Sequence, residues 1–137
     1  MKKMGLLLGV LVIAAVVAIS GCTSTTNNSS QLTVGNVSVS GPDDLGDYNL
    51  NTTITPNQDF DYLEMHLTWY DSSGAIIYTD PLAWNVNDAK SGQVYDVGAS
   101  SDLYQKGTPT KVVVEIYNSV GATSDDLIYN STVNINS

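Results

Sequence analysis

Few side chains in this chain of 137 residues can do chemistry: it has one cysteine, Cys22, and one histidine, His66. In a strand, His66 would share a face with Glu64 and Thr68, each two residues away. The composition is compatible with a Ser-His-acid triad, yet the sequence has no Gly-x-Ser-x-Gly and no His-Glu-x-x-His. A lone histidine on the outer face of a strand is more often solvated than catalytic, and we expect no enzymatic activity.

The charge balance and the scarce residue types exclude several classes of function. The chain has five lysines, no arginine and fourteen acids, which give a formal charge of −9. Nucleic-acid binding depends on Lys and Arg. A disulfide needs two cysteines, and a Cys/His zinc site needs more than one of each. We therefore expect no nucleic-acid partner, no disulfide framework and no zinc site of that kind.

The N-terminus has the pattern of an export signal. Two lysines precede an unbroken run of apolar residues and glycines over 4–19, which is followed by Ser20, Gly21 and Cys22. This run of 16 residues is shorter than the roughly 20 that a membrane span needs, and small residues before a cleavage point are typical of a signal peptide. Ile-Ser-Gly-Cys resembles the lipobox of exported lipoproteins, which implies that the Cys22 thiol is lipidated and becomes the first residue of the mature chain.

The chain divides into a lipoprotein signal peptide over 1–21, a flexible tether rich in Ser, Thr and Asn over 22–31, and one folded domain over 32–136. An uncleaved apolar anchor over 4–19 is the alternative, and it would hold the same domain outside the membrane. From Cys22 onward three lysines stand against fourteen acids, a net charge of −11, so anionic head groups should repel the domain. We expect it at the extracytoplasmic face of the cell membrane, anchored by lipid on Cys22.

Five Asn-x-Ser/Thr triplets follow the predicted cleavage point, and in an exported protein each is a candidate glycan acceptor. A chain rich in Asn, Ser and Thr also produces such triplets by chance. The two in the tether are the most accessible. The triplets begin at Asn27, Asn28, Asn36, Asn51 and Asn130.

Alternation of apolar and polar residues dominates residues 32–136, which indicates strands rather than helices. The clearest run is 62–70, with Leu63, Met65, Leu67 and Trp69 on one face. About seven strands over roughly 105 residues, separated by turn residues, are typical of an all-β, two-sheet sandwich of immunoglobulin-like size. The other strands are predicted at 32–39 with a bulge near Gly35, and at 48–55, 75–79, 93–97, 111–118 and 127–135.

Turn residues set several of these strand ends. Residues 71–74 are predicted to form a hairpin loop because Gly74 can take the left-handed conformation that ends such turns. Pro81 is predicted to end the strand 75–79, since proline cannot donate to a ladder, and residues 83–90 can hold a helical turn. The expected bulky core residues are Trp69 and Trp84.

The stretch YLEMHLTWYDSSGAII over 62–77 resembles the core of the FxLYD family, small β-sandwich domains of prokaryotic surface lipoproteins. Residues 67–71, LTWYD, stand where the family has aromatic-x-Leu-Tyr-Asp, with leucine replacing the aromatic residue and tryptophan replacing the leucine. The resemblance implies an exported, non-catalytic module, and it supplies no catalytic residues.

Acidic residues in predicted loops are the candidates for metal binding. Calcium takes six to eight oxygen ligands, and sandwich loops that gather aspartates can supply them. Acidic turn residues that keep an exported surface soluble are the better explanation, so we expect no cofactor, with calcium as the alternative. The first candidates are Asp43, Asp44 and Asp47.

Tyrosines on the polar side of two strands indicate a binding face. Tyr62 and Tyr70 flank His66 in one predicted strand, and Tyr117 lies on the polar side of another that an immunoglobulin-like order places next to it. Tyrosine offers rigid contact area for protein or sugar partners, although cross-strand pairing also favours it in sheets. We predict a non-catalytic binding or adaptor lipoprotein with a protein or glycan partner. The alternative is a calcium-stabilised cell-wall or adhesion module.

Overall fold

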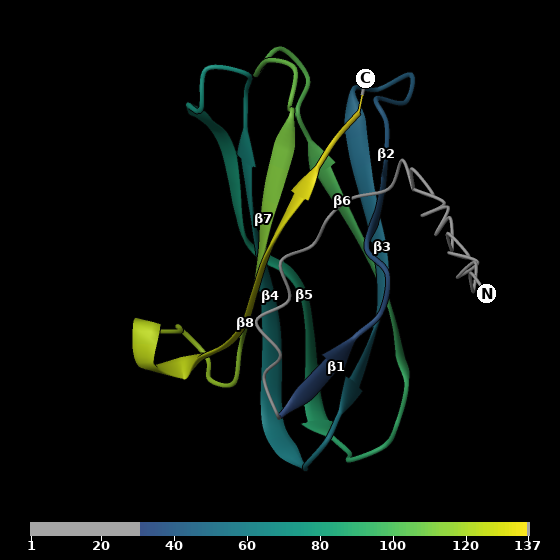
Figure 1. Ribbon diagram of the computed structural model, residues 1–137, viewed down its shortest axis with the longest axis vertical. Helices are drawn as coiled ribbons and strands as arrows, with labels where there is room; N and C mark the ends of the chain where they lie inside the picture. Colours follow the sequence, from purple (N-terminus) through teal and green to yellow (C-terminus); the bar gives the residue numbers. More distant parts are fainter. Residues whose placement is uncertain (1–30, 137) are drawn as a thin grey trace, which may run out of the picture.

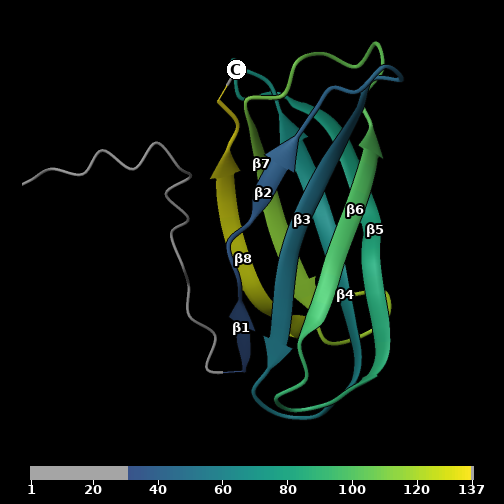
Figure 2. The same cartoon turned by 90° about the vertical axis from the view of Figure 1, so that its right-hand side faces the viewer.

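Two antiparallel sheets pack face to face in the computed structural model, as Figure 1 and Figure 2 show. The structure describes residues 31–136, so the predicted signal peptide, Cys22, Asn27 and Asn28 lie outside the described residues. Strands dominate this part of the chain, which confirms the predicted β-sandwich. No helix within it is long and apolar enough to cross a membrane.

The first sheet, called sheet A, is built around β3 (Asp47–Pro56). Along one edge of β3 lie β1 (Leu32–Val34) and then β2 (Ser38–Ser40), and along the other lies β6 (Tyr95–Asp102). The single interrupted strand predicted over 32–39 is therefore two strands that share one partner.

The break between β1 and β2 falls at Gly35. The Gly35 N–H donates to the Thr53 carbonyl at 2.8 Å, so the chain stays attached to β3 where the regular ladder stops. A Cβ atom on Gly35 would lie 2.3 Å from Thr53 Oγ1, closer than any real contact. Glycine at this position lets the backbone pass close to the Thr53 side chain.

The second sheet, called sheet B, has the order β5-β4-β7-β8. Its strands are β4 (Phe60–Tyr70), β5 (Ile76–Ala89), β7 (Lys111–Tyr117) and β8 (Leu127–Asn134), and the short 3-10 turn η1 (Ser124–Asp126) precedes β8. The predicted adjacency of β4 and β7 is confirmed. The predicted hairpin is present as well, with Gly74 at φ +84° in the loop between β4 and β5.

Strand β5 corrects two predictions. It continues past Pro81 to Ala89, so Pro81 does not end it, and residues 83–89 are extended rather than helical. The proline falls in an irregularity of the pairing, because Leu67 faces Asp80 whereas Met65 faces Trp84. At the edge of a sheet, a proline within a bulge costs little in ladder hydrogen bonds.

The core lies between the sheets and centres on Trp69, which is fully buried. Its indole Nε1–H donates to Ser101 Oγ of β6 at 3.1 Å, so the one polar atom of the ring is satisfied across the sandwich. The ring of Tyr48 packs 5.8 Å from that of Trp69. Trp84, the other predicted core tryptophan, is only half-buried and packs on Tyr95 at the margin.

Candidate functional site

A carboxylate is buried on the outer face of sheet B, the face turned away from the core. Along β4, Leu63 and Met65 point into the core, so Glu64 between them points outward. Even so, Glu64 is only 4% exposed. An outward side chain can be this buried only when neighbours on the same face cover it.

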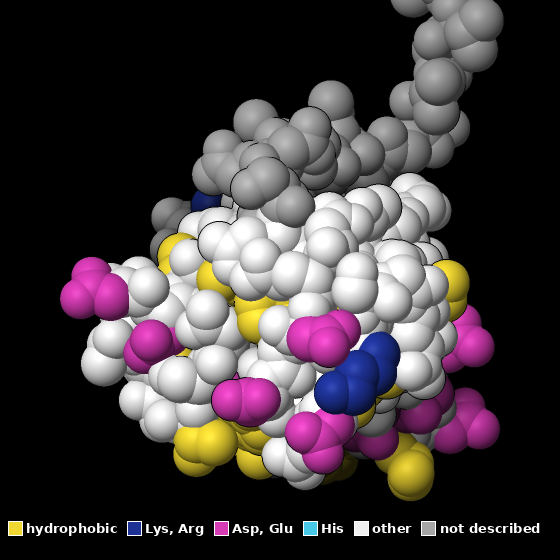
Figure 3. All heavy atoms as spheres, turned by 90° about the horizontal axis from the view of Figure 1, so that it is seen from below, with side chains coloured by type: hydrophobic (Ala, Val, Ile, Leu, Met, Phe, Trp, Pro, Cys, Tyr) yellow, Lys and Arg dark blue, Asp and Glu magenta, His cyan; other side chains and the backbone are white. Residues whose placement is uncertain are grey.

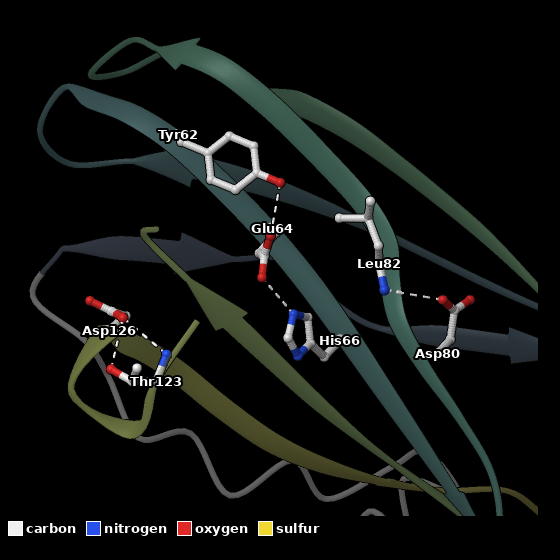
Figure 4. A network of polar contacts seen from close by, with 7 residues as sticks. All are labelled: Tyr62, Glu64, His66, Asp80, Leu82, Thr123 and Asp126. Carbon is white, nitrogen blue, oxygen red and sulfur yellow. Dashed lines mark hydrogen bonds and ion pairs between the residues drawn. The ribbon is translucent and has the colours of Figure 1, made fainter. Parts of the chain in front are cut away.

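The cover consists of Tyr62, His66 and Tyr117, which together with Glu64 we call the Glu64 cluster. The Tyr62 hydroxyl donates to Glu64 Oε2 at 2.8 Å, and His66 Nε2 lies 2.7 Å from Glu64 Oε1. Figure 4 shows both contacts along β4. The ring of Tyr117 packs on that of His66, with centroids 4.5 Å apart. Both carboxylate oxygens are thus engaged, and the rings are held in place.

The register between β4 and β7 brings the cluster together. Glu64 faces Tyr117 and His66 faces Glu115. Because side chains directly opposite each other in an antiparallel pair lie about 5 Å apart, this register places two carboxylates, two tyrosines and one imidazole on one patch. Sequence reasoning put Glu64 on the same strand face as His66 but did not predict that it is buried there, and it missed Glu115 altogether.

Desolvation and, after it, the neighbouring carboxylates raise the pKa of both tyrosines above the ordinary value of 10.0. For Tyr62 the largest cause is desolvation, followed by the hydrogen bond and the charge of Glu64, with Asn85 acting in the opposite direction. For Tyr117 the causes are desolvation, then the charge and hydrogen bond of Glu115, then the charge of Glu64. Both hydroxyls therefore stay protonated at neutral pH, and that of Tyr62 donates to Glu64.

Tyr70, also predicted to belong to this face, lies apart from the cluster. It is eight residues along β4 from Tyr62, about 26 Å for an extended strand. The Lys111 ammonium lies over the Tyr70 ring, 4.9 Å from its centroid, in a cation–π contact. Of the four residues predicted for the binding face, the structure brings together Tyr62, His66 and Tyr117.

The loop predicted as the first calcium candidate uses Asp43 to shape its own turn. Asp43 Oδ1 accepts the N–H groups of Leu45 at 2.9 Å and Asp47 at 3.0 Å. Asp44 is exposed beside it. Over residues 31–136 no group of three or more His, Cys, Asp or Glu side chains is placed to hold a metal ion.

The three glycosylation triplets within the described chain occupy different surroundings. Asn36 is exposed in the break between β1 and β2. Asn51 is exposed on the outer face of sheet A. Asn130 is half-buried on β8, opposite Glu115.

Acidic side chains are also exposed at the end of the sandwich where β1 begins. Figure 3 looks at this end and shows acidic side chains around a few apolar patches, with little exposed lysine. Such a surface carries a negative electrostatic potential.

No family model matches the chain, and no curated protein matches it. Among solved structures, the fold is similar to that of a Niemann-Pick type C2 protein from the Japanese carpenter ant. That similarity has a TM-score of 0.52 and 13% identity, and it covers 79% of this chain and 93% of the other. A weaker similarity, with a TM-score of 0.40 and 10% identity, is to β-glucosidase 3B from Thermotoga neapolitana, over 82% of this chain and 16% of that one. At these identities the first similarity supports the sandwich fold, and the second adds nothing to the argument.

Proposed function

We propose that this chain is an exported lipoprotein, anchored through Cys22 at the extracytoplasmic face of the membrane, that acts as a non-catalytic binding module. The partner is a protein or a glycan, and it docks on the outer face of sheet B. The resemblance of residues 62–77 to the FxLYD domains of surface lipoproteins supports the same proposal.

One observation carries the choice of face, namely the Glu64 cluster. Exposed tyrosines usually keep some rotamer freedom, which a partner must remove on binding. Here the hydroxyl of Tyr62 is tied to Glu64, and the ring of Tyr117 rests on His66. Rigid aromatic side chains with polar tips give contact area at a low entropic cost, as in many recognition surfaces.

The arrangement of His66 supports binding rather than catalysis. A general base in acyl transfer holds a nucleophile on one ring nitrogen and an orienting carboxylate on the other. Glu64 supplies the carboxylate on Nε2 of His66, but the ring packs against the tilted ring of Tyr117 rather than against a serine or threonine hydroxyl. We therefore assign the imidazole to the contact surface.

Site-specific photo-crosslinking tests the proposal in the full-length protein within its own membranes. A benzophenone amino acid replaces Thr68, on the outer face of sheet B, or in the matched control Ser100, on the outer face of sheet A. We expect one dominant adduct from position 68, none from position 100, and loss of the adduct when Tyr117→Ala is added. Equal adducts from both faces, or an adduct that survives Tyr117→Ala, would overturn the assignment of the face.

A further inference from the structure

The outer face of sheet A differs in chemistry from the outer face of sheet B. Its outward positions on β2 and β3 carry only small or polar side chains, and those on β6 include Gly98 and Ser100. No large apolar residue is exposed at these positions. Such a surface offers a partner protein little area for apolar contact. The outward residues of β2 and β3 beyond Asp47 are Ser38, Ser40, Asn49, Asn51, Thr53 and Thr55.

Asn51 stands at the centre of this face between two very small neighbours. It is opposite Ser38 of β2 and opposite Gly98 of β6. A Cβ atom on Gly98 would already be in contact with Asn51 Oδ1 at 3.5 Å, so a larger residue there would crowd the amide. The Asn51 side chain is exposed, and Thr53 completes its Asn-x-Thr triplet on the same face.

Asn36 lies close by, at an edge of the same sheet that no other strand of residues 31–136 covers. It is exposed in the break between β1 and β2, two residues before Ser38, which completes its triplet and faces Asn51. A sheet edge with unpaired backbone groups is open to pairing with another chain unless something bulky blocks it. A group attached to Asn36 would block this edge.

Asn130 has the opposite setting. It is half-buried on β8 and faces Glu115, which itself faces His66 of the Glu64 cluster. A bulky group on Asn130 would cover the outer face of sheet B.

We infer that at least one of Asn36 and Asn51 carries an N-linked glycan that covers the outer face of sheet A, while Asn130 remains unmodified. The glycan occupies the face without apolar contact area, and the face with the tyrosines stays free. N-linked glycans are hydrophilic groups of exposed surfaces, and the small neighbours of Asn51 leave room for the first sugar. This inference rests on the export that the proposed function includes.

Peptide mapping of the protein purified from its own membranes tests the inference. Cleavage before aspartate gives peptides 47–58 and 126–137, and cleavage after leucine or tyrosine gives 33–45, so mass spectrometry reads the three asparagines separately. We expect a sugar mass on 33–45, on 47–58 or on both, and none on 126–137. The matching Asn→Gln variant should abolish each added mass, whereas Asn130→Gln should change none.

Two bare peptides over 33–45 and 47–58, or a sugar on 126–137, would overturn the inference. Labelling of lysines on intact cells with a membrane-impermeant reagent measures export separately. It therefore distinguishes an absent glycan from failure of the proposed function. A labelled but unglycosylated chain contradicts the glycan alone. An unlabelled chain contradicts export, and the inference fails with it.

Discussion

Oε1 of Glu64 lies 2.7 Å from Nε2 of His66 on the outer face of sheet B. This carboxylate is as buried as a core residue although its side chain points away from the core. Its burial comes from side chains on two strands, since Tyr62 and His66 lie on β4 and Tyr117 on β7. The Glu64 cluster therefore depends on the pairing of β4 with β7 and, in turn, fixes the tyrosine surface.

Removing the Glu64 carboxylate should destabilise the domain. Glu64→Ala removes the charged partner that the half-buried Tyr62 hydroxyl and His66 ring share, and a hydrogen bond to a charged group is worth about 1.5–3 kcal/mol. Glu64→Gln should cost less, because its amide oxygen still accepts from Tyr62. The free energy of unfolding in urea measures both changes. Asp61→Ala, at an exposed position on the same strand, is the control and should change little.

The tyrosines of the cluster should make the fold less stable in strong base. The pKa of Tyr62 and that of Tyr117 are raised in the folded chain above 10.0. A raised folded pKa means that the folded state holds its proton more tightly than the unfolded state, so stability falls as the pH rises past 10. Glu64→Gln removes a negative charge and should lower the pKa of Tyr62. Absorbance titration of tyrosinate in the variant and the parent measures this, and an unchanged titration would contradict the coupling to Glu64.

The hydrogen bond from the Trp69 indole to the Ser101 hydroxyl should contribute to the stability of the domain. Ser101→Ala removes the acceptor 3.1 Å from Nε1 and leaves the buried N–H without a partner. We expect a loss of about 1–3 kcal/mol in the free energy of unfolding. Ser100→Ala, one residue earlier on the exposed face, is the matched control. Equal effects of the two substitutions would show that the hydrogen bond contributes nothing specific.

Period-two alternation was enough to predict the faces of β4, because each apolar residue from Leu63 to Trp69 has the same requirement for burial. It was not enough for β5. Pro81 predicts the end of a strand, but β5 lies at the edge of sheet B, where the missing N–H of a proline matters little. Strand β6 extends to Asp102, beyond the predicted end at Val97, because its small residues pack on β3 despite their weak strand propensity.

The candidate site was predictable only in part, for a related reason. Alternation gives the face of a residue within its own strand, and it correctly put Tyr62, His66 and Tyr117 outward. The burial of Glu64 requires the register that places it opposite Tyr117, 53 residues later in the sequence, and no local pattern contains that register. Tyr70 was assigned to the same face correctly, but its distance along β4 separates it from the cluster.

The hairpin between β4 and β5 should lose stability in acid. Asp71 Oδ1 accepts from Ser73 Oγ at 2.6 Å and from the N–H groups of Ser73 and Ala75. These bonds, with that of Ser73 Oγ the largest cause, hold the pKa of Asp71 below 3.8. A depressed folded pKa gives stability that is present above 3.8 and is lost as the pH falls through the folded pKa.

Asp71→Asn provides the test of that acid dependence. The variant lacks the charge at every pH, so its melting temperature should be lower than that of the parent at pH 7 and should converge with it at the acid end. Thermal melts followed by circular dichroism from pH 7 to pH 2 measure the two curves. A difference that stays constant over this range would show that ionisation of Asp71 does not stabilise the hairpin.

Substitution of Cys22 distinguishes a cleaved, lipidated N-terminus from an uncleaved apolar anchor over residues 4–19. If Cys22 is lipidated after cleavage, Cys22→Ser should prevent lipid attachment and leave an unprocessed chain, about 2 kDa heavier in its polypeptide because residues 1–21 are retained. Thr23→Ser, next to the cysteine, should be processed normally. Intact mass of the membrane-extracted protein reads cleavage and lipid in one measurement. An uncleaved parent without added lipid mass would instead show that residues 4–19 are a permanent anchor, in which case Cys22→Ser should change neither processing nor membrane association.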